Sequence, residues 1–285
     1  MNSKRYISNK ILLWLCISNL TLLNTVATQN VDSLLTIWVS TKDTLVADAI
    51  YSQAKKYFTK DIDSSLLLAI KSAELSERLK YTAGCINAYR GISAIAPRAG
   101  DNEMALVYIE KGIELIDQKN LPLKEKLNFI INKGASYLHQ NKLGLAIEAN
   151  IEAYQLAKSI GLKDKAGLIL NNMGVLYRKT EEYEKAVETY KESIALREEM
   201  QDSIGIANSL YNLGATYAKI DSASLAFEVL NQAKSIFTKL NDQQSLLDCD
   251  LSIGTAAYDL GKYDFAQKIL NEVEKNSKAS FEPLE

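Results

Sequence analysis

The side chains that most often carry out acid–base, nucleophilic or metal chemistry are scarce in this 285-residue sequence. His139 is its one histidine, and its three cysteines are scattered. A nucleophilic serine or cysteine needs a neighbouring base, and a zinc site needs three or four suitable ligands. Because the sequence supplies neither set, we expect no catalytic residue, no metal site and no cofactor. His139 is interpreted as a helix-end residue, with contact to a partner as the alternative.

Stretches of charge or glycine elsewhere do not complete a known reactive motif. Gly261-Lys262 lacks the upstream glycine and the following serine or threonine of a phosphate-binding loop. The acidic run at residues 181–185 is typical of a turn and a helix start, where carboxylates complement the helix dipole. With 33 basic and 35 acidic residues, the chain has no surplus of cations for phosphate groups. We therefore predict a protein that is not an enzyme and does not bind nucleic acid.

The elements that must position any functional surface recur at one fixed interval along the chain. In each copy a glycine is followed at a constant spacing by an alanine, and the pairs are Gly134 with Ala146, Gly174 with Ala186, Gly214 with Ala226, and Gly254 with Ala266. A glycine inside a helix costs about 1 kcal/mol relative to alanine, so its recurrence needs an offsetting gain. We expect each glycine to face its alanine, so that two helix backbones pack closely. A third small position is expected to receive the next copy, at Ala153, Ser193 and Ala233.

Each period contains two helical patterns of apolar residues. Leu176 and Tyr177 lie on the apolar face of one pattern, and Tyr190 and Ile194 lie on that of the next. Between the two patterns stands a residue that tolerates the left-handed backbone conformation, namely Gly100, Asn141, Asp221 or Gly261, with Glu181 as the exception. The repeated unit is therefore predicted to be an antiparallel helical hairpin.

Two of the copies resemble the core of the tetratricopeptide repeat. They are Asn-Met-Gly-Val-Leu-Tyr at 172–177 followed by Tyr-Glu-Lys-Ala at 183–186, and Asn-Leu-Gly-Ala-Thr-Tyr at 212–217 followed by Ala226. The 40-residue period resembles the variety of this family with helices longer than the usual repeat of about 34 residues. The resemblance implies an all-α, right-handed superhelical solenoid of about six hairpins over residues 43–278. We expect the hairpins at 43–80, 81–120, 121–161, 162–201, 202–241 and 242–278, with Gln53 and Ser93 replacing the glycine in the first two.

The same resemblance implies a ligand groove along the first helix of each hairpin. The contact positions of the family fall here on Arg90, Asn128, Asn171, Arg178, Lys179, Asn208, Tyr211 and Lys219. Amides can bond the backbone of an extended peptide, and cations can hold an acidic side chain or a C-terminal carboxylate. We therefore expect a protein or an extended peptide as the partner, an acidic one in particular, and no small-molecule substrate. The alternative for each residue is an ordinary solvated helix face.

Residues 1–28 have the three-part pattern of a secretory signal peptide. Lys4, Arg5 and Lys10 precede an apolar run at 11–23, and small residues follow at 25–27. The run has about 13 residues, short of the roughly 20 that a helix needs to span a bilayer. We expect cleavage and export to the periplasm or the extracellular space, with an uncleaved membrane anchor as the alternative. Residues 29–42 would be a linker or an N-terminal extension.

The other end of the chain predicts an exposed apolar edge. Solenoids usually end in a polar capping helix. Here the last predicted helix carries Phe265, Ile269, Leu270 and Val273 and is followed by a short tail at 279–285. We expect this edge to dock on a second copy of the chain, on another partner, or on a domain lost from this chain.

Cys85 and Cys249 lie about four repeats apart. Since the repeats of a solenoid contact only their neighbours, the two Cα atoms are not expected to approach the ~4.4–6.8 Å that a disulfide requires. Both residues are interpreted as small buried packing residues.

Together these features favour a non-enzymatic adaptor or scaffold that is exported from the cytoplasm and binds a protein or peptide. A signal peptide followed by repeats of this length also resembles the extracytoplasmic part of bacterial sensor kinases and transcription regulators that contain tetratricopeptide repeats. The alternative is therefore an extracytoplasmic sensor module of a signalling system.

Overall fold

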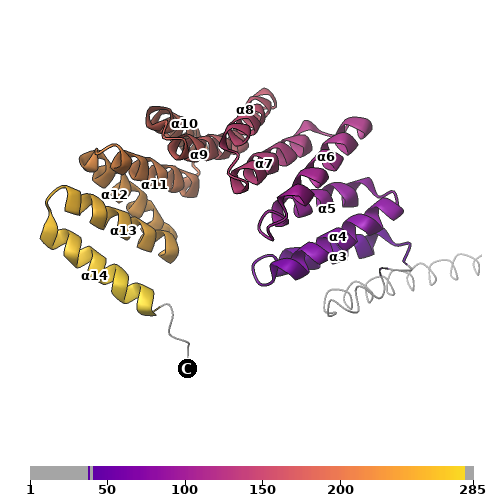
Figure 1. The fold of residues 1–285 in the computed structure, drawn as a ribbon, viewed down its shortest axis with the longest axis horizontal. Helices are drawn as coiled ribbons and strands as arrows, with labels where there is room; N and C mark the ends of the chain where they lie inside the picture. The colour runs from indigo at the N-terminus through magenta and orange to yellow at the C-terminus, as the bar shows by residue number, and fades with distance from the viewer. Residues whose placement is uncertain (1–37, 39–40, 280–285) are drawn as a thin grey trace, which may run out of the picture. The chain divides into compact units, whose positions relative to one another are not determined.

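All regular secondary structure in the described part of the chain is helical. The computed structural model describes residue 38 and residues 41–279 (Figure 1). The chain divides into two compact units, an N-terminal unit of residues 1–140 and a C-terminal unit of residues 141–285. The helices of the N-terminal unit are α3 (Thr44–Tyr57), α4 (Ile62–Arg78), α5 (Thr82–Ile95), α6 (Asn102–Lys119) and α7 (Leu123–His139). Those of the C-terminal unit are α8 (Leu143–Ser159), α9 (Lys163–Lys179), α10 (Tyr183–Glu199), α11 (Ser203–Lys219), α12 (Ala223–Leu240), α13 (Gln243–Asp259) and α14 (Tyr263–Ala279).

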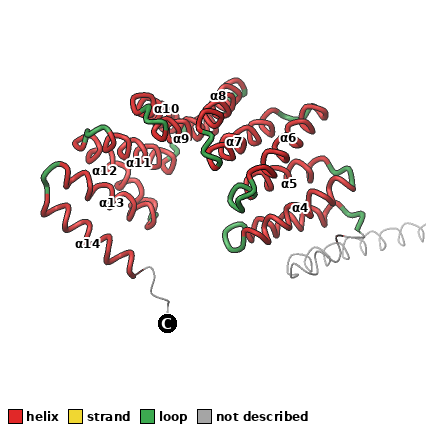
Figure 2. The backbone as a smooth tube through the Cα atoms, in the orientation of Figure 1, coloured by secondary structure: helices red, strands yellow, loops and turns green. Residues whose placement is uncertain are grey.

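Consecutive helices within each unit pack against each other and are joined by short turns, drawn green in Figure 2. The hairpins are α3/α4 and α5/α6 in the N-terminal unit, and α9/α10, α11/α12 and α13/α14 in the C-terminal unit. The predicted all-α fold of stacked helical hairpins is confirmed. α7 and α8 belong to different units, so the hairpin at 121–161 stays a prediction.

The period of the sequence has a simple origin in helix and turn lengths. In the C-terminal unit, helices α8 to α11 each have 17 residues, and short turns of equal length separate them. A residue with positive φ therefore recurs at half the period, once in every turn, at Asn141, Gly161, Glu181, Gln201, Asp221, Asn241 and Gly261. Glu181, the exception in the sequence pattern, has a φ of 63° and takes the same left-handed conformation as its glycine and asparagine counterparts. The hairpin turn is thus set by the backbone and not by residue type alone.

The recurring glycines make room for a large side chain of the second helix. A Cβ atom on Gly174 would lie 2.5 Å from the ring of Tyr190, and one on Gly214 would lie 2.6 Å from Cγ of Leu230. Gly254 meets Leu270 in the same way, at 2.7 Å. The nearest neighbour therefore lies one helical turn beyond the alanine that the sequence suggested. The alanines Ala186, Ala226 and Ala266 are buried beside this contact.

Two contacts show how one hairpin meets the next. In the N-terminal unit, a Cβ on Gly112 of α6 would collide with the ring of Phe129 of α7. In the C-terminal unit, the hydroxyl groups of Ser193 on α10 and Ser209 on α11 lie 3.0 Å apart and are buried. The small position on the second helix therefore receives the first helix of the next hairpin. This matches the role expected of it from the sequence.

Each unit has its own apolar core. Ile50, Leu68, Ile92, Ile109 and Phe129 are among the fully buried side chains of the N-terminal unit. Leu230, Ala233, Phe237, Cys249 and Ile253 form the corresponding core between α12 and α13 in the C-terminal unit. Burying a large apolar side chain contributes about 1.5–3 kcal/mol, so this layer between first and second helices supplies most of the stabilisation.

The apolar edge expected on α14 is partly covered, so the sequence prediction is wrong for Ile269. Ile269 is 6% exposed and belongs to the core with Ile253, and Leu270 packs against the same cluster. Val273 is half-buried, and only Phe265 among the four is exposed. The outer face of α14 carries Gln267, Lys268, Asn271 and Glu272, all exposed. The helix thus turns its apolar side inward and presents a polar face to solvent, as a capping helix does.

Trp38 lies against α4. Its indole Nε1 donates a hydrogen bond to the carbonyl of Lys71, at 2.8 Å, and the ammonium of Lys71 lies 4.2 Å from the centre of the ring. The guanidinium of Arg78 donates to the carbonyl of Trp38. The described end of the predicted linker at 29–42 is therefore packed on the first hairpin. The predicted signal peptide at 1–28 lies outside the described residues.

Replacing Gly214 with alanine tests the glycine contact. The new methyl group would overlap Leu230, and relief of such overpacking costs about 1–3 kcal/mol, so we expect the urea midpoint of unfolding followed by circular dichroism to fall. Gly144 is the matched control, because it also lies in a helix but a Cβ there meets nothing within 4 Å. Gly144→Ala should raise stability by up to about 1 kcal/mol. Equal effects at the two sites would contradict the assignment.

Candidate functional site

The first helices of the C-terminal unit, α9, α11 and α13, are neighbours and share one face. α11 contacts both α9 and α13, so the three helices lie in a row. Residues at helical spacing share the face of each helix. We call this the first-helix face, defined by Leu168, Asn171, Val175 and Arg178 on α9, by Ile204, Asn208, Tyr211 and Ala215 on α11, and by Asp248, Leu251, Thr255 and Tyr258 on α13.

Large apolar side chains remain exposed on the first-helix face. Leu168 is 37% exposed, Ile204 53%, Leu251 52% and Tyr258 61%. On the opposite side of the same helices, Ile169, Leu210 and Ile253 are buried against second helices. Exposed apolar side chains that share one face make it a candidate interaction site.

Asn171, a predicted groove residue, is engaged within the protein. Its Oδ1 accepts hydrogen bonds from Nδ2 of Asn212 at 3.1 Å and from Oγ of Ser209 at 3.3 Å. Ser209 in turn meets Ser193, whose hydroxyl donates to the carbonyl of Gly167. These bonds form a polar network across α9, α10 and α11. The side-chain oxygen of Asn171 therefore holds neighbouring helices together, and contact with a partner would be an additional role.

Arg178 is half-buried beside Tyr190 of α10. Burial raises the pKa of Tyr190 to about 12, and the neighbouring Arg178 guanidinium acts in the opposite direction. By contrast, Lys179, Asn208 and Lys219 are exposed. Within residues 41–279, neither lysine forms an ion pair. They are the free cations that the groove prediction requires.

Tyr211 lies at the centre of the first-helix face. Its ring is half-buried and packs against the apolar core between α11, α12 and α13. The core therefore holds the ring of Tyr211 in place, while part of the ring stays accessible to a partner. Residues of this kind often dominate the energy of a binding surface.

The predicted groove residues of the N-terminal unit also have internal partners. Nη1 of Arg90 lies 2.9 Å from Glu125 on α7, and its Nη2 bonds Oδ1 of Asn87. The Asn128 amide donates to the carbonyl of Lys124 on its own helix. Arg90 thus links α5 to α7. The structure gives it a positioning role whether or not a partner also contacts it.

A recurring asparagine was missed in the sequence analysis. Asn132 Nδ2 donates to Oγ of Ser93 at 2.7 Å, and to the carbonyl of Arg90 at 3.3 Å. Asn212, two repeats later, donates to Asn171 in the equivalent direction, from one first helix to the one before it. The signal was present, because Asn132, Asn172 and Asn212 all stand two positions before a recurring glycine. The amides of Asn132 and Asn212 tie successive hairpins together.

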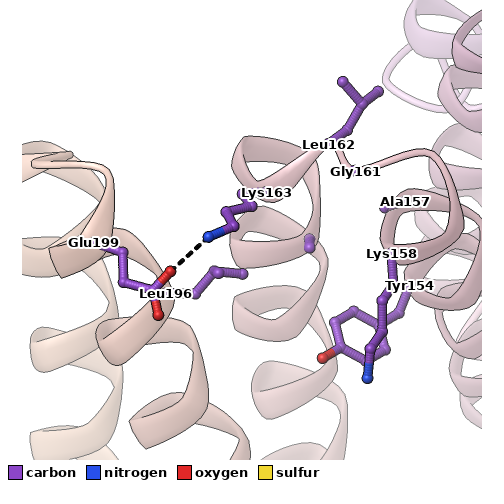
Figure 3. Close-up of a pocket in the computed structure, with 9 residues that line it drawn as sticks. Tyr154, Ala157, Lys158, Gly161, Leu162, Lys163, Leu196 and Glu199 are labelled. Carbon is purple, nitrogen blue, oxygen red and sulfur yellow. Dashed lines mark hydrogen bonds and ion pairs between the residues drawn. The ribbon is translucent and has the colours of Figure 1, made fainter.

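A hollow of about 310 Å³ lies between α8, α9 and α10 (Figure 3). The apolar residues that line it are Ala157, Leu162, Ala166 and Leu196, and the polar residues are Tyr154, Lys158, Lys163 and Glu199. Lys163 and Glu199 form an ion pair of 2.8 Å on one side, and Tyr154 and Lys158 lie on the other (Figure 3).

Tyr154 is fixed by a hydrogen bond from its hydroxyl to Oε1 of Glu192, at 2.5 Å. Burial and this carboxylate raise its pKa to about 12, so it stays a neutral donor at ordinary pH. Lys158 is exposed, and within residues 41–279 its ammonium group has no ion pair or hydrogen bond. The rim of the hollow therefore has one free cation.

The side chains that could react or bind metals are few and separate. His139 is exposed at the end of α7. Cys85 and Cys249 are buried free thiols, as predicted, and burial raises the pKa of Cys249 to about 12. Across residue 38 and residues 41–279, no group of three or more metal-binding side chains gathers. None of the helices in this part of the chain has both the length and the apolar character to span a bilayer.

Comparison with known proteins agrees with this geometry. Residues 126–199 match the family model described as tetratricopeptide repeat. No curated protein sequence matches the chain.

Similarity to solved structures extends over most of the chain. The crystal structure of BtubC (BKLC) from P. vanneervenii has a TM-score of 0.70 at 16% identity, over 79% of this chain and 95% of that one. A signal transduction ATPase with numerous domains and a tetratricopeptide repeat sensor, from Pyrococcus horikoshii, has a TM-score of 0.69 at 17% identity, over 83% of this chain and 36% of that one. A Rap protein complexed with competence and sporulation factor has a TM-score of 0.55 at 16% identity, over 77% of this chain and 66% of that one. These likenesses show the fold, and with the match at 126–199 they support a tetratricopeptide repeat family.

Replacing Asn171 with alanine separates its structural role from ligand contact. The change removes the acceptor of the Asn212 amide and leaves the Ser209 hydroxyl with Ser193 as its partner, and a lost acceptor costs about 1–3 kcal/mol. We expect the urea midpoint to fall for Asn171→Ala and to stay within about 0.5 kcal/mol of the wild type for Asn208→Ala, which is exposed. Unchanged stability in Asn171→Ala would show that the network is not needed for the stacking of α9 and α11.

Proposed function

We propose that this chain is a non-enzymatic adaptor that binds an extended segment of another protein along the first-helix face. The observation that carries the proposal is the exposure of Leu168, Ile204 and Leu251 on three adjacent first helices. A solvated surface gains nothing from such side chains, whereas a bound segment would bury them at about 25 cal/mol per Å² of apolar area. Tyr211 stands between them as the anchor.

The charges at the C-terminal ends of the helices that carry this face favour an acidic partner where it crosses α9 and α11. Lys179 and Lys219 occupy equivalent positions at the ends of these two helices and are unpaired among the described residues. On α13 the equivalent residue is Asp259, and Asp248 lies on the same helix. A segment with acidic residues toward α9 and α11 and a neutral or basic part toward α13 would match this distribution.

The amide of Asn208 suits an extended backbone. It is exposed at the middle of the row, so its donor and acceptor can bond a peptide group of the partner. The similar Rap protein was solved in complex with competence and sporulation factor, which supports a partner of protein or peptide type. Self-association through α14 is not part of the proposal, because Ile269 is buried.

Export is part of the proposal and rests on the signal pattern of residues 1–28. The absence of catalytic function rests on the single histidine and on the lack of an assembled reactive group in the described residues. The alternative, an extracytoplasmic sensor module, draws support from the similar ATPase with a tetratricopeptide repeat sensor. In either case the first-helix face is the surface that meets the partner.

Site-specific photo-crosslinking tests where the partner binds. A benzophenone amino acid at Tyr211 should capture the partner segment, and the same group at Glu188, exposed on α10, should not. The captured segment, made as a peptide, should bind Tyr211→Ala at least tenfold more weakly, since loss of an aromatic anchor costs about 1.4 kcal/mol or more. Glu188→Ala should bind it as the wild type does. Affinity would be measured by fluorescence anisotropy.

The same binding assay tests whether the partner is acidic. Lys179→Gln combined with Lys219→Gln should weaken binding and reduce its dependence on salt. Capture through Glu188 together with an unaltered affinity in Tyr211→Ala would reject the first-helix face. A lysine double variant with unchanged affinity would reject the acidic partner alone.

A further inference from the structure

The hollow between α8, α9 and α10 exists because one copy of the repeat departs from the others. Ala157 stands where Arg197 and Phe237 stand in the next two copies, and these two are 8% and 1% exposed. Ala166 likewise stands where Ile206 and Leu246 pack against the core of later copies. Two large side chains are thus missing from the same place. The space that they fill elsewhere in the C-terminal unit is open here.

The same copy also lacks a carboxylate that later copies possess. Leu162 occupies the position of Asp202 and Asp242. In the next copy, Asp202 accepts the Gly205 N–H and pairs with Arg197 at 2.6 Å, so an acid group and an apolar stem together fill the junction. Around Leu162 neither group is present. The junction at Leu162 therefore lacks both the acid group and the apolar stem that fill it in the next copy.

The rim of the hollow is suited to an acid. Lys158 is unpaired among the described residues, and the Lys163–Glu199 pair is exposed on both sides, at 62% and 60%. Exposed pairs contribute about 0–1 kcal/mol, so Lys163 can exchange Glu199 for another carboxylate at little cost. The floor of Ala157, Ala166 and Leu196 is apolar.

From this arrangement we propose that the hollow binds a small amphipathic carboxylate, with its apolar body over Ala157 and Ala166 and its acid group between Lys158 and Lys163. A volume of about 310 Å³ lies within the range of pockets that hold small molecules. It exceeds the space that one protein side chain fills, which favours a whole small molecule over an inserted residue of a partner. The site is separate from the first-helix face and does not depend on the proposed adaptor function.

Octanoate and octan-1-ol are suitable probes, because they share an apolar chain and differ in charge. Binding to the full chain would be measured by isothermal titration calorimetry. Octanoate should bind at one site, and octan-1-ol at least fivefold more weakly. Lys158→Gln should weaken octanoate binding about two- to fivefold, the range for an exposed charge pair, and leave octan-1-ol unaffected.

Filling the hollow with the residues of later copies is the structural control. Ala157→Phe introduces the residue found at Phe237, and Leu162→Asp introduces the residue found at Asp202 and Asp242. Each should weaken octanoate binding at least tenfold, the first by occupying the space and the second by placing a carboxylate beside the ligand's acid group. Circular dichroism would establish that each variant is folded. Leu162 lies in a surface turn, so Leu162→Asp still tests the site if Ala157→Phe does not fold.

The outcomes separate the alternatives. No saturable octanoate binding, or equal binding by the filled variants, would overturn the site. Equal affinity for octanoate and octan-1-ol would overturn the acid class. Binding of a short peptide with a C-terminal leucine carboxylate, without binding of octanoate, would overturn the small molecule in favour of a chain end.

Discussion

The structure depends on one contact, the one between a glycine of the first helix and the large side chain that faces it from the second helix of the same hairpin. Tyr190, Leu230 and Leu270 lie so close to Gly174, Gly214 and Gly254 that a methyl group would not fit. Each glycine costs about 1 kcal/mol as a helix residue. The cost is offset because the second helix can then bury a full aromatic or leucine side chain against the first.

This contact decides which surfaces remain for function. It commits one side of α9, α11 and α13 to their own hairpins, and a second side of α7 and α11 is used by the amides of Asn132 and Asn212, which bond the preceding first helix. The side left over carries Leu168, Ile204 and Leu251, which stay exposed. In later copies of the repeat a large side chain, Arg197 or Phe237, fills the space between one hairpin and the next. In the copy with Ala157 and Ala166 this space is a hollow.

The sequence predicted the hairpins because their cause is local and periodic. A helix of 17 residues and a short turn, taken twice, give the constant stride of the glycines. The neighbour of each glycine was not predictable, since it depends on the angle between helices and not on spacing. Asn171 and Arg90 were placed correctly on first helices, but their bonds to Asn212 and Glu125 depend on how hairpins stack. The hollow was not predicted because it results from small side chains at two alanines, Ala157 and Ala166. The burial of Ile269 was not predicted because it depends on helix α14 turning its apolar side inward.

A double-mutant cycle between Gly214 and Leu230 tests the central contact most directly. If the glycine is present to admit this leucine, Leu230→Ala will create a space in which the methyl group of Gly214→Ala fits. The free energy of unfolding lost in the double variant should then be smaller than the sum of the two single losses, by about 1–3 kcal/mol. Additive losses would show that the two residues do not interact, and the packing account of the repeat would be wrong.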